Sequence, residues 1–88
     1  MQYNKKSRIS TADDVRGFFN FLVNERKVNL HPDDRFEDYL SCESRNNMFS
    51  QEECAVYNRL MDESFEVCEK NGADIYAIGL GIMQKALA

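Results

Sequence analysis

The sequence lacks several features on which common protein functions depend. Its 88 residues include one histidine and three cysteines, and no two cysteines form a CxxC pair. A metal site needs several such ligands close together, so this composition argues against one. The four glycines form no glycine-rich turn between a strand and a helix, which argues against the common phosphate-binding loops.

Long apolar runs are also missing. The longest extends from Ile75 to Met83, well short of the ~20 residues that a membrane-spanning helix needs. The first residues are polar and do not have the pattern of a secretory signal peptide. An odd number of cysteines favours unpaired thiols in a reducing compartment. We therefore expect a cytoplasmic protein that makes no membrane contact.

What is present is typical of one small globular domain. Hydrophobic residues make up 43% of the chain and charged residues 30%, close to the average for folded proteins. A chain of this length can form one core but has no room for a second domain. We expect a flexible polar and basic arm over residues 1–9, followed by a single helical domain over residues 10–88.

Acidic residues outnumber basic ones by 15 to 11, which gives a net charge of −4. A negative surface repels the phosphate backbone of nucleic acids, so we do not expect a general nucleic-acid binder. The one basic cluster is formed by Lys5, Lys6 and Arg8. In an alternative interpretation, the protein is a nucleic-acid-linked regulator whose arm contacts phosphate through these three residues.

Hydrophobic periodicity predicts three long helices. The first begins at Ser10 or Thr11, whose hydroxyl can cap it, and ends near Lys27. The next begins after Ser50, because residues 50–53 form a capping box, and ends at Gly72. The predicted core residues of these two helices are Val15, Phe18, Phe19, Leu22 and Val23, and Cys54, Tyr57, Leu60, Met61, Ser64, Phe65, Val67 and Cys68.

The last segment, residues 75–87, is predicted to be a helix capped by Asp74. Large and small residues alternate over residues 76–82, which is typical of a strand, but no other segment offers a partner strand. A short helix is predicted over residues 32–40 and a loop over residues 41–49. The predicted fold class is all-α: a small antiparallel bundle of three long helices plus one short helix.

Catalytic patterns are scarce. His31 stands beside Asp33 and Asp34, but adjacent residues of a helix point in different directions, and we interpret the group as the start of the short helix. Cys42 is expected in a loop, exposed but with no residue to activate its thiol. No serine or cysteine lies in a nucleophile motif. We predict a protein that is not an enzyme and uses no metal, cofactor or small-molecule substrate.

The first and last helices carry more apolar surface than one core contact requires. Phe21 lies on the side of the first helix away from its main apolar stripe. On the last helix Tyr76, Leu80, Met83 and Leu87 form a second stripe, which widens the apolar arc to about 200°. In one interpretation the small core encloses all of this apolar surface. We predict instead that Phe21, Tyr76, Leu80 and Leu87 form an exposed surface that docks a protein partner or a second copy of the chain.

Two segments, HPDDRFEDY over residues 31–39 and VCEKNGADIY over residues 67–76, resemble a family of small uncharacterised bacterial proteins associated with mobile elements. The resemblance covers most of the chain beyond residue 20. It implies a bacterial, cytoplasmic protein, and it implies no site residues.

Overall fold

The computed structural model describes residues 3–28, 30 and 50–87. Its elements are α1 (Ala12–Asn20), the π-helical turn η1 (Phe21–Glu25), α4 (Gln51–Asn71) and α5 (Ile75–Leu87). These residues contain no strand, so the predicted helical fold is confirmed for this part of the chain. The predicted short helix and the loop over residues 41–49 lie outside the described residues.

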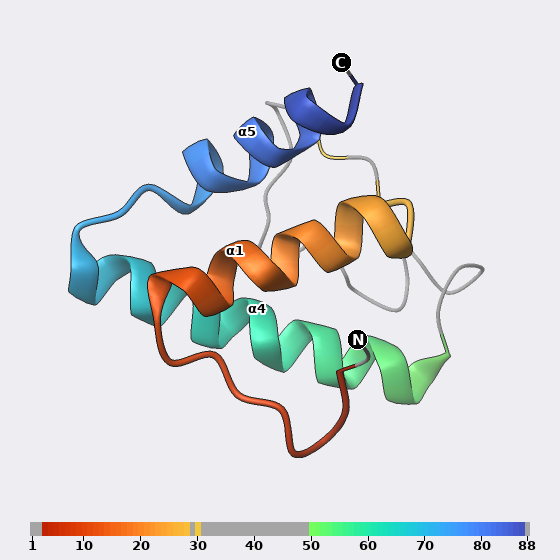
Figure 1. Ribbon diagram of the computed structural model, residues 1–88. Helices are drawn as coiled ribbons and strands as arrows, with labels where there is room; N and C mark the ends of the chain where they lie inside the picture. The colour runs from red at the N-terminus through yellow and green to blue at the C-terminus, as the bar shows by residue number, and fades with distance from the viewer. Residues whose placement is uncertain (1–2, 29, 31–49, 88) are drawn as a thin grey trace.

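The three α-helices pack against one another, with α1 between α4 and α5 (Figure 1). The predicted apolar stripe of the first helical segment is buried, and Phe18, Phe19 and Leu22 are completely enclosed. On α4, Leu60 and Met61 belong to the same core. Two details of the predicted α4 face differ: Val56 is buried, whereas Phe65 is only half-buried.

Local capping residues determine where α1 and α4 begin. The Thr11 hydroxyl accepts the N–H of Asp14 at 3.1 Å, and the Asp14 carboxylate accepts the N–H of Thr11 at 3.1 Å. Ser50 and Glu53 form the same reciprocal pair at the start of α4, with both distances 3.1 Å. At its other end α4 stops at Gly72, whose φ of 64° is readily adopted by a residue without a Cβ.

Directly after α1 the chain continues as the π-helical turn η1, which is wider than an α-helix. In η1 the Arg26 N–H donates to the Phe21 carbonyl at 3.1 Å, which is the wider spacing of a π-turn. The turn buries three consecutive side chains, at positions 21–23. The helical segment ends with η1 at Glu25, within two residues of its predicted end near Lys27, where φ is 58°.

The last segment is a helix, as predicted. The Asp74 carboxylate accepts the N–H of Tyr76 at 3.0 Å and that of Ala77 at 3.3 Å, and so caps α5. Only Ile75 and Gly79 of α5 are buried. The other residues of this helix are half-buried or exposed, and several of them are large and apolar.

Candidate interaction surfaces

Three of the four predicted interface residues lie along one side of α5. Leu87 is 75% exposed, and Tyr76 and Leu80 are half-buried. Met83, also half-buried, lies on the same side, because spacings of four, three and four residues return successive side chains to one helix face. We call Tyr76, Leu80, Met83 and Leu87 the α5 outer face.

Phe21 does not belong to this surface, contrary to the prediction. It is 6% exposed, and its ring lies edge-to-face at 5.0 Å from the ring of Tyr3 and 5.7 Å from that of Tyr57. The prediction was wrong because it considered helical position alone. Tyr3 precedes the helix in the chain and covers the side of the first helical segment that was expected to be open.

A groove of about 410 Å³ borders the C-terminal end of the α5 outer face. It lies between the end of α5 and the segment that includes and follows η1, which run close together in Figure 1. Its lining is mainly apolar, with two polar side chains, and comprises Val23, Asn24, Lys27, Val28, Met83, Ala86 and Leu87. Such a lining suits a side chain with an apolar body and a polar tip.

The N-terminal segment is packed on α4, which differs from the predicted flexible arm. Ile9 is buried, and its N–H donates to a carboxylate oxygen of Glu63 at 2.8 Å. The Arg59 guanidinium donates to the carbonyls of Asn4 at 3.3 Å and Lys5 at 3.2 Å. The packed unit therefore begins before residue 10, because long-range contacts to α4 hold a segment whose composition alone is typical of a solvated terminus.

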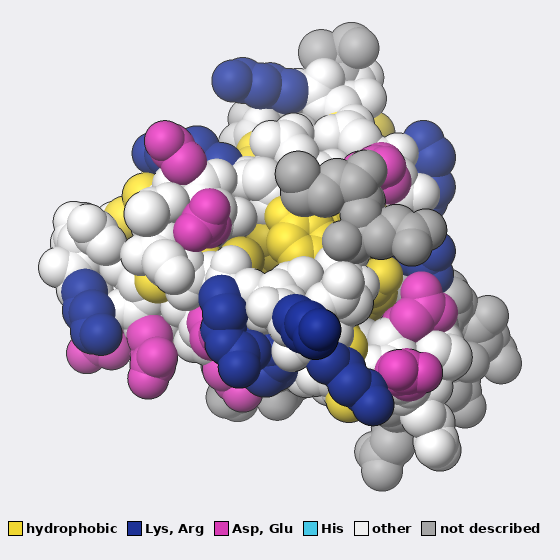
Figure 2. Space-filling view, turned by 60° about the horizontal axis from the view of Figure 1, so that its bottom comes forward, with side chains coloured by type: hydrophobic (Ala, Val, Ile, Leu, Met, Phe, Trp, Pro, Cys, Tyr) yellow, Lys and Arg dark blue, Asp and Glu magenta, His cyan; other side chains and the backbone are white. Residues whose placement is uncertain are grey.

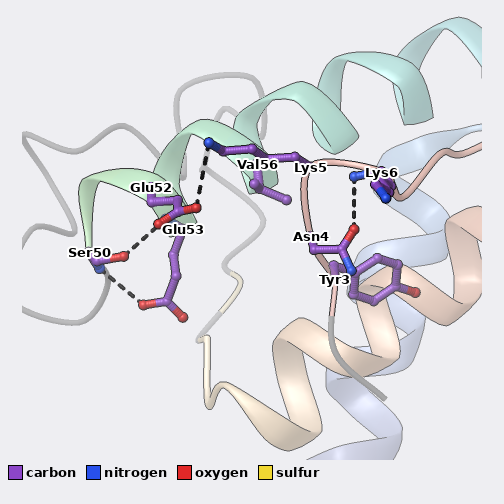
Figure 3. A pocket seen from close by; sticks show the side chains of 8 residues that line it. All are labelled: Tyr3, Asn4, Lys5, Lys6, Ser50, Glu52, Glu53 and Val56. Carbon is purple, nitrogen blue, oxygen red and sulfur yellow. Dashed lines mark hydrogen bonds and ion pairs between the residues drawn. The ribbon is translucent and has the colours of Figure 1, made fainter.

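Two of the three predicted phosphate-contacting residues pair with carboxylates of α4. Lys5 Nζ lies 3.7 Å from Glu52, as Figure 3 shows, and Arg8 Nη1 lies 3.8 Å from Glu63. Lys6 is exposed. On the face shown in Figure 2, a group of basic side chains lies in the lower middle of the view, with acidic side chains on either side of it. A phosphate group would have to compete with these carboxylates for Lys5 and Arg8.

The N-terminal segment and the start of α4 also border a cleft of about 450 Å³ (Figure 3). It is lined by Tyr3, Asn4, Lys5, Lys6, Ser50, Glu52, Glu53 and Val56. Glu53 caps α4, accepts the Tyr57 hydroxyl at 3.5 Å and pairs with Arg26 at 3.0 Å. Because the cleft contains both signs of charge, and Lys5 and Glu52 pair across it, its electrostatics favour neither an anion nor a cation.

The remaining chemical candidates form no site within the described part of the chain. His31 and Cys42 lie outside it. Cys54 and Cys68 are buried thiols, and burial raises the pKa of Cys68, which lowers its reactivity at neutral pH. Among residues 3–28, 30 and 50–87, no three His, Cys, Asp or Glu side chains are grouped to hold a metal. No helix in these ranges has the length and apolar character to cross a membrane.

Comparison with known proteins gives no family assignment: no family model, curated protein or solved structure matches the chain. The resemblance to small bacterial proteins associated with mobile elements therefore stays a prediction.

Sequence reasoning missed two residues that shape these surfaces, Tyr3 and Glu63. Tyr3 and Ile9 are the apolar residues of the otherwise polar segment 3–9, and this pair was a signal that the segment could pack. Glu63 is not among the predicted core residues of its helix. Nothing in the local sequence shows that Glu63 binds the N-terminal segment, because its partners there, Ile9 and Arg8, are more than 50 residues away.

Proposed function

We propose that this protein is a small non-enzymatic interaction protein that binds a protein partner through the α5 outer face. The supporting observation is the contrast between the composition of α5 and its burial. Its 13 residues include one charged residue, Lys85, yet only Ile75 and Gly79 are buried. An apolar helix that its own fold leaves half-exposed is typical of a protein–protein interface.

The energy available from covering this face fits a reversible complex. Complete burial of one Leu or Met side chain contributes roughly 1.5–3 kcal/mol. Covering the exposed parts of four such side chains would contribute on the order of 3–5 kcal/mol before the cost of association. The groove beside Leu87 adds further apolar surface to the same area.

The proposal takes the fold to be the predicted antiparallel bundle of three long helices and one short helix, in a bacterial cytoplasm. In this arrangement α5 is an outer helix, because α1 separates most of it from α4. An outer helix can present one side to the core and another to a partner. No metal, cofactor or catalytic residue is required for such a role.

A photo-crosslinking amino acid at position 87, in the protein produced in its native host, tests the proposal. Leu87 is 75% exposed, so the probe should not disturb the fold. Irradiation should give adducts with a protein, and Leu80→Glu in the same chain should reduce them. The matched control carries the probe at Ala55, an exposed position of α4. The proposal fails if position 87 gives no more adduct than position 55.

A further inference from the structure

The apolar contacts of residues 3–9 lie at the two ends of this segment. At one end Tyr3 packs on the aromatic rings of α1 and η1, and at the other end Ile9 is buried. Between these ends, the cleft of about 450 Å³ lies between the segment and the start of α4 (Figure 3). Lys5 and Glu52 pair across the cleft, but their side chains are 80% and 73% exposed, so the pair contributes little. The segment therefore spans a gap between two apolar contacts.

The middle of the segment has hydrogen bonds of its own. The Ser7 N–H donates to the Asn4 carbonyl at 3.0 Å, and the Asn4 N–H donates to the Ser7 hydroxyl at 2.9 Å. The Lys6 N–H donates to the side-chain oxygen of Asn4 at 2.8 Å. These bonds close a turn that needs no contact with α4. The segment can therefore keep its local shape when it moves.

The start of α1 does not depend on the segment. Thr11 and Asp14 cap the helix with each other, and the Asp14 carboxylate also accepts the Ser10 N–H at 2.9 Å. These bonds remain if the residues before Ser10 move away. A hinge at Ser10 would therefore leave the first turn of α1 intact.

Glu63 supports two separate attachments of the segment to α4. One of its oxygens accepts the Ile9 N–H at 2.8 Å, and the other lies 2.7 Å from the Arg59 guanidinium. The second contact orients that guanidinium, which donates to the carbonyls of Asn4 and Lys5. Loss of the charge on Glu63 would therefore weaken both attachments at once.

We propose that residues 3–9 form a releasable strap, which opens as a unit about Ser10 while the three helices stay packed, and that protonation of Glu63 favours the open form. Opening moves the Tyr3 ring away and uncovers the rings of Phe18 and Phe21, which are 0% and 6% exposed in the closed form. This inference does not depend on a partner for the α5 outer face.

Acid favours the open form because Glu63 loses partners when the strap opens. In the closed form burial acts to raise its pKa, whereas the Ile9 N–H and the guanidinium groups of Arg59 and Arg8 lower it, and together they hold it below 4.5. In the open form Glu63 keeps only its neighbour Arg59 in water, which shifts a carboxyl pKa little. The closed form is therefore favoured above the open-form pKa and loses this advantage as pH falls through the closed-form value.

Hydrogen exchange in low concentrations of urea tests whether the strap opens separately. Amides that exchange through full unfolding exchange faster as urea is added, whereas local opening exposes little surface and responds little. Below the unfolding transition, exchange of the Ile9 N–H should change little, and exchange of the Leu60 N–H inside α4 should rise steeply. The same urea dependence for both amides would mean that the segment leaves only with the whole fold, which overturns the inference.

The same measurement at neutral pH tests the role of Glu63. Glu63→Gln should speed exchange of the Ile9 N–H about tenfold, because the closed form loses a charged acceptor. Glu66→Gln is the matched control, since it removes the same charge from an exposed position of α4. It should leave exchange of the Ile9 N–H nearly unchanged. Equal rates in the two variants would overturn the assignment of Glu63.

A tryptophan at position 3 reports the uncovering directly, because the chain contains no other tryptophan. As Tyr3→Trp is acidified, its emission should shift to longer wavelength at least about half a pH unit above the pH at which far-UV circular dichroism shows loss of helix. Asp14→Asn, which removes a carboxylate at the hinge, should not abolish this separation, whereas Glu63→Gln should. Emission and helix content that change together overturn the inference. The exchange measurements on Ile9 do not require this variant, so they test the strap even if the larger ring does not fit.

Discussion

The backbone N–H of Ile9 donates to Oε1 of Glu63 at 2.8 Å, across 54 positions of the sequence. Arg59 donates to the other carboxylate oxygen at 2.7 Å, and Arg8 lies 3.8 Å from that same oxygen. Burial acts to raise the pKa of Glu63, but the Ile9 N–H and the two guanidinium groups together hold it below its usual 4.5. One carboxylate thus fastens the N-terminal segment to α4.

Glu63 should make stability fall at acidic pH. Because its pKa is lower in the folded state, the stability it contributes is complete above the unfolded pKa of 4.5 and is lost as pH falls through the folded value. Glu63→Gln should lower the free energy of unfolding at neutral pH by about 1–2 kcal/mol, since the amide oxygen can still accept the Ile9 N–H but carries no charge. Urea unfolding should show a smaller difference between the two proteins well below pH 4. An unchanged difference would contradict this role.

Tyr3 should stabilise the fold by covering Phe18 and Phe21. Its ring lies edge-to-face with theirs, at centroid distances of 5.4 and 5.0 Å. Tyr3→Ala should lower the free energy of unfolding by about 2 kcal/mol, whereas Tyr3→Phe keeps the ring and should cost less than about 0.5 kcal/mol. Denaturant unfolding measures both. Indistinguishable stabilities for the alanine and phenylalanine variants would mean that the segment does not act as a cover in solution.

The parts of the fold that could be predicted from the sequence depend on residues close together in the chain. The capping pair of Ser50 and Glu53, and the glycine that ends α4, act within one helical turn. The choice of helix for residues 75–87 was also correct, because a helix satisfies its own backbone hydrogen bonds and needs no partner strand. The α5 outer face could be placed for the same reason, since residue spacing alone defines it.

The parts that could not be predicted depend on contacts between distant segments. In a helical-wheel projection each residue is rotated by 100° from the one before it. The projection does not show which other segments of the chain pack against the helix. Phe21 was therefore placed on an open surface, although Tyr3 covers it. The bond between Ile9 and Glu63 was missed for the same reason.

Lys27 has a left-handed backbone, with φ of 58°, which is unfavourable for a residue with a Cβ. This conformation lets the Val28 N–H, six residues further along the chain, reach the Leu22 carbonyl at 2.9 Å just after η1 ends. Lys27→Gly should raise the free energy of unfolding by up to about 1 kcal/mol, and Lys27→Val should lower it by a similar amount. Thermal unfolding ranks the three proteins. A valine variant as stable as the glycine variant would show that the turn is not left-handed.

Two glycines should respond in opposite ways to alanine. Gly81 lies inside α5, and nothing lies within 4 Å of an added Cβ, so Gly81→Ala should stabilise by about 0.5–1 kcal/mol through helix propensity. Gly72 also has open space around it, but its φ is 64°, so Gly72→Ala should destabilise by about 1 kcal/mol. The denaturant midpoint should rise for Gly81→Ala and fall for Gly72→Ala. Equal shifts in the same direction would contradict the backbone assignment.

The two sides of α5 should also differ in what they stabilise. Ile75 is 5% exposed and Leu87 is 75% exposed. In the purified protein Ile75→Ala should lower the free energy of unfolding by about 2–4 kcal/mol and Leu87→Ala by less than about 0.5 kcal/mol, as measured by denaturant unfolding. A large cost for Leu87→Ala would mean that this side chain holds the fold together, which would remove the argument for a partner on the α5 outer face.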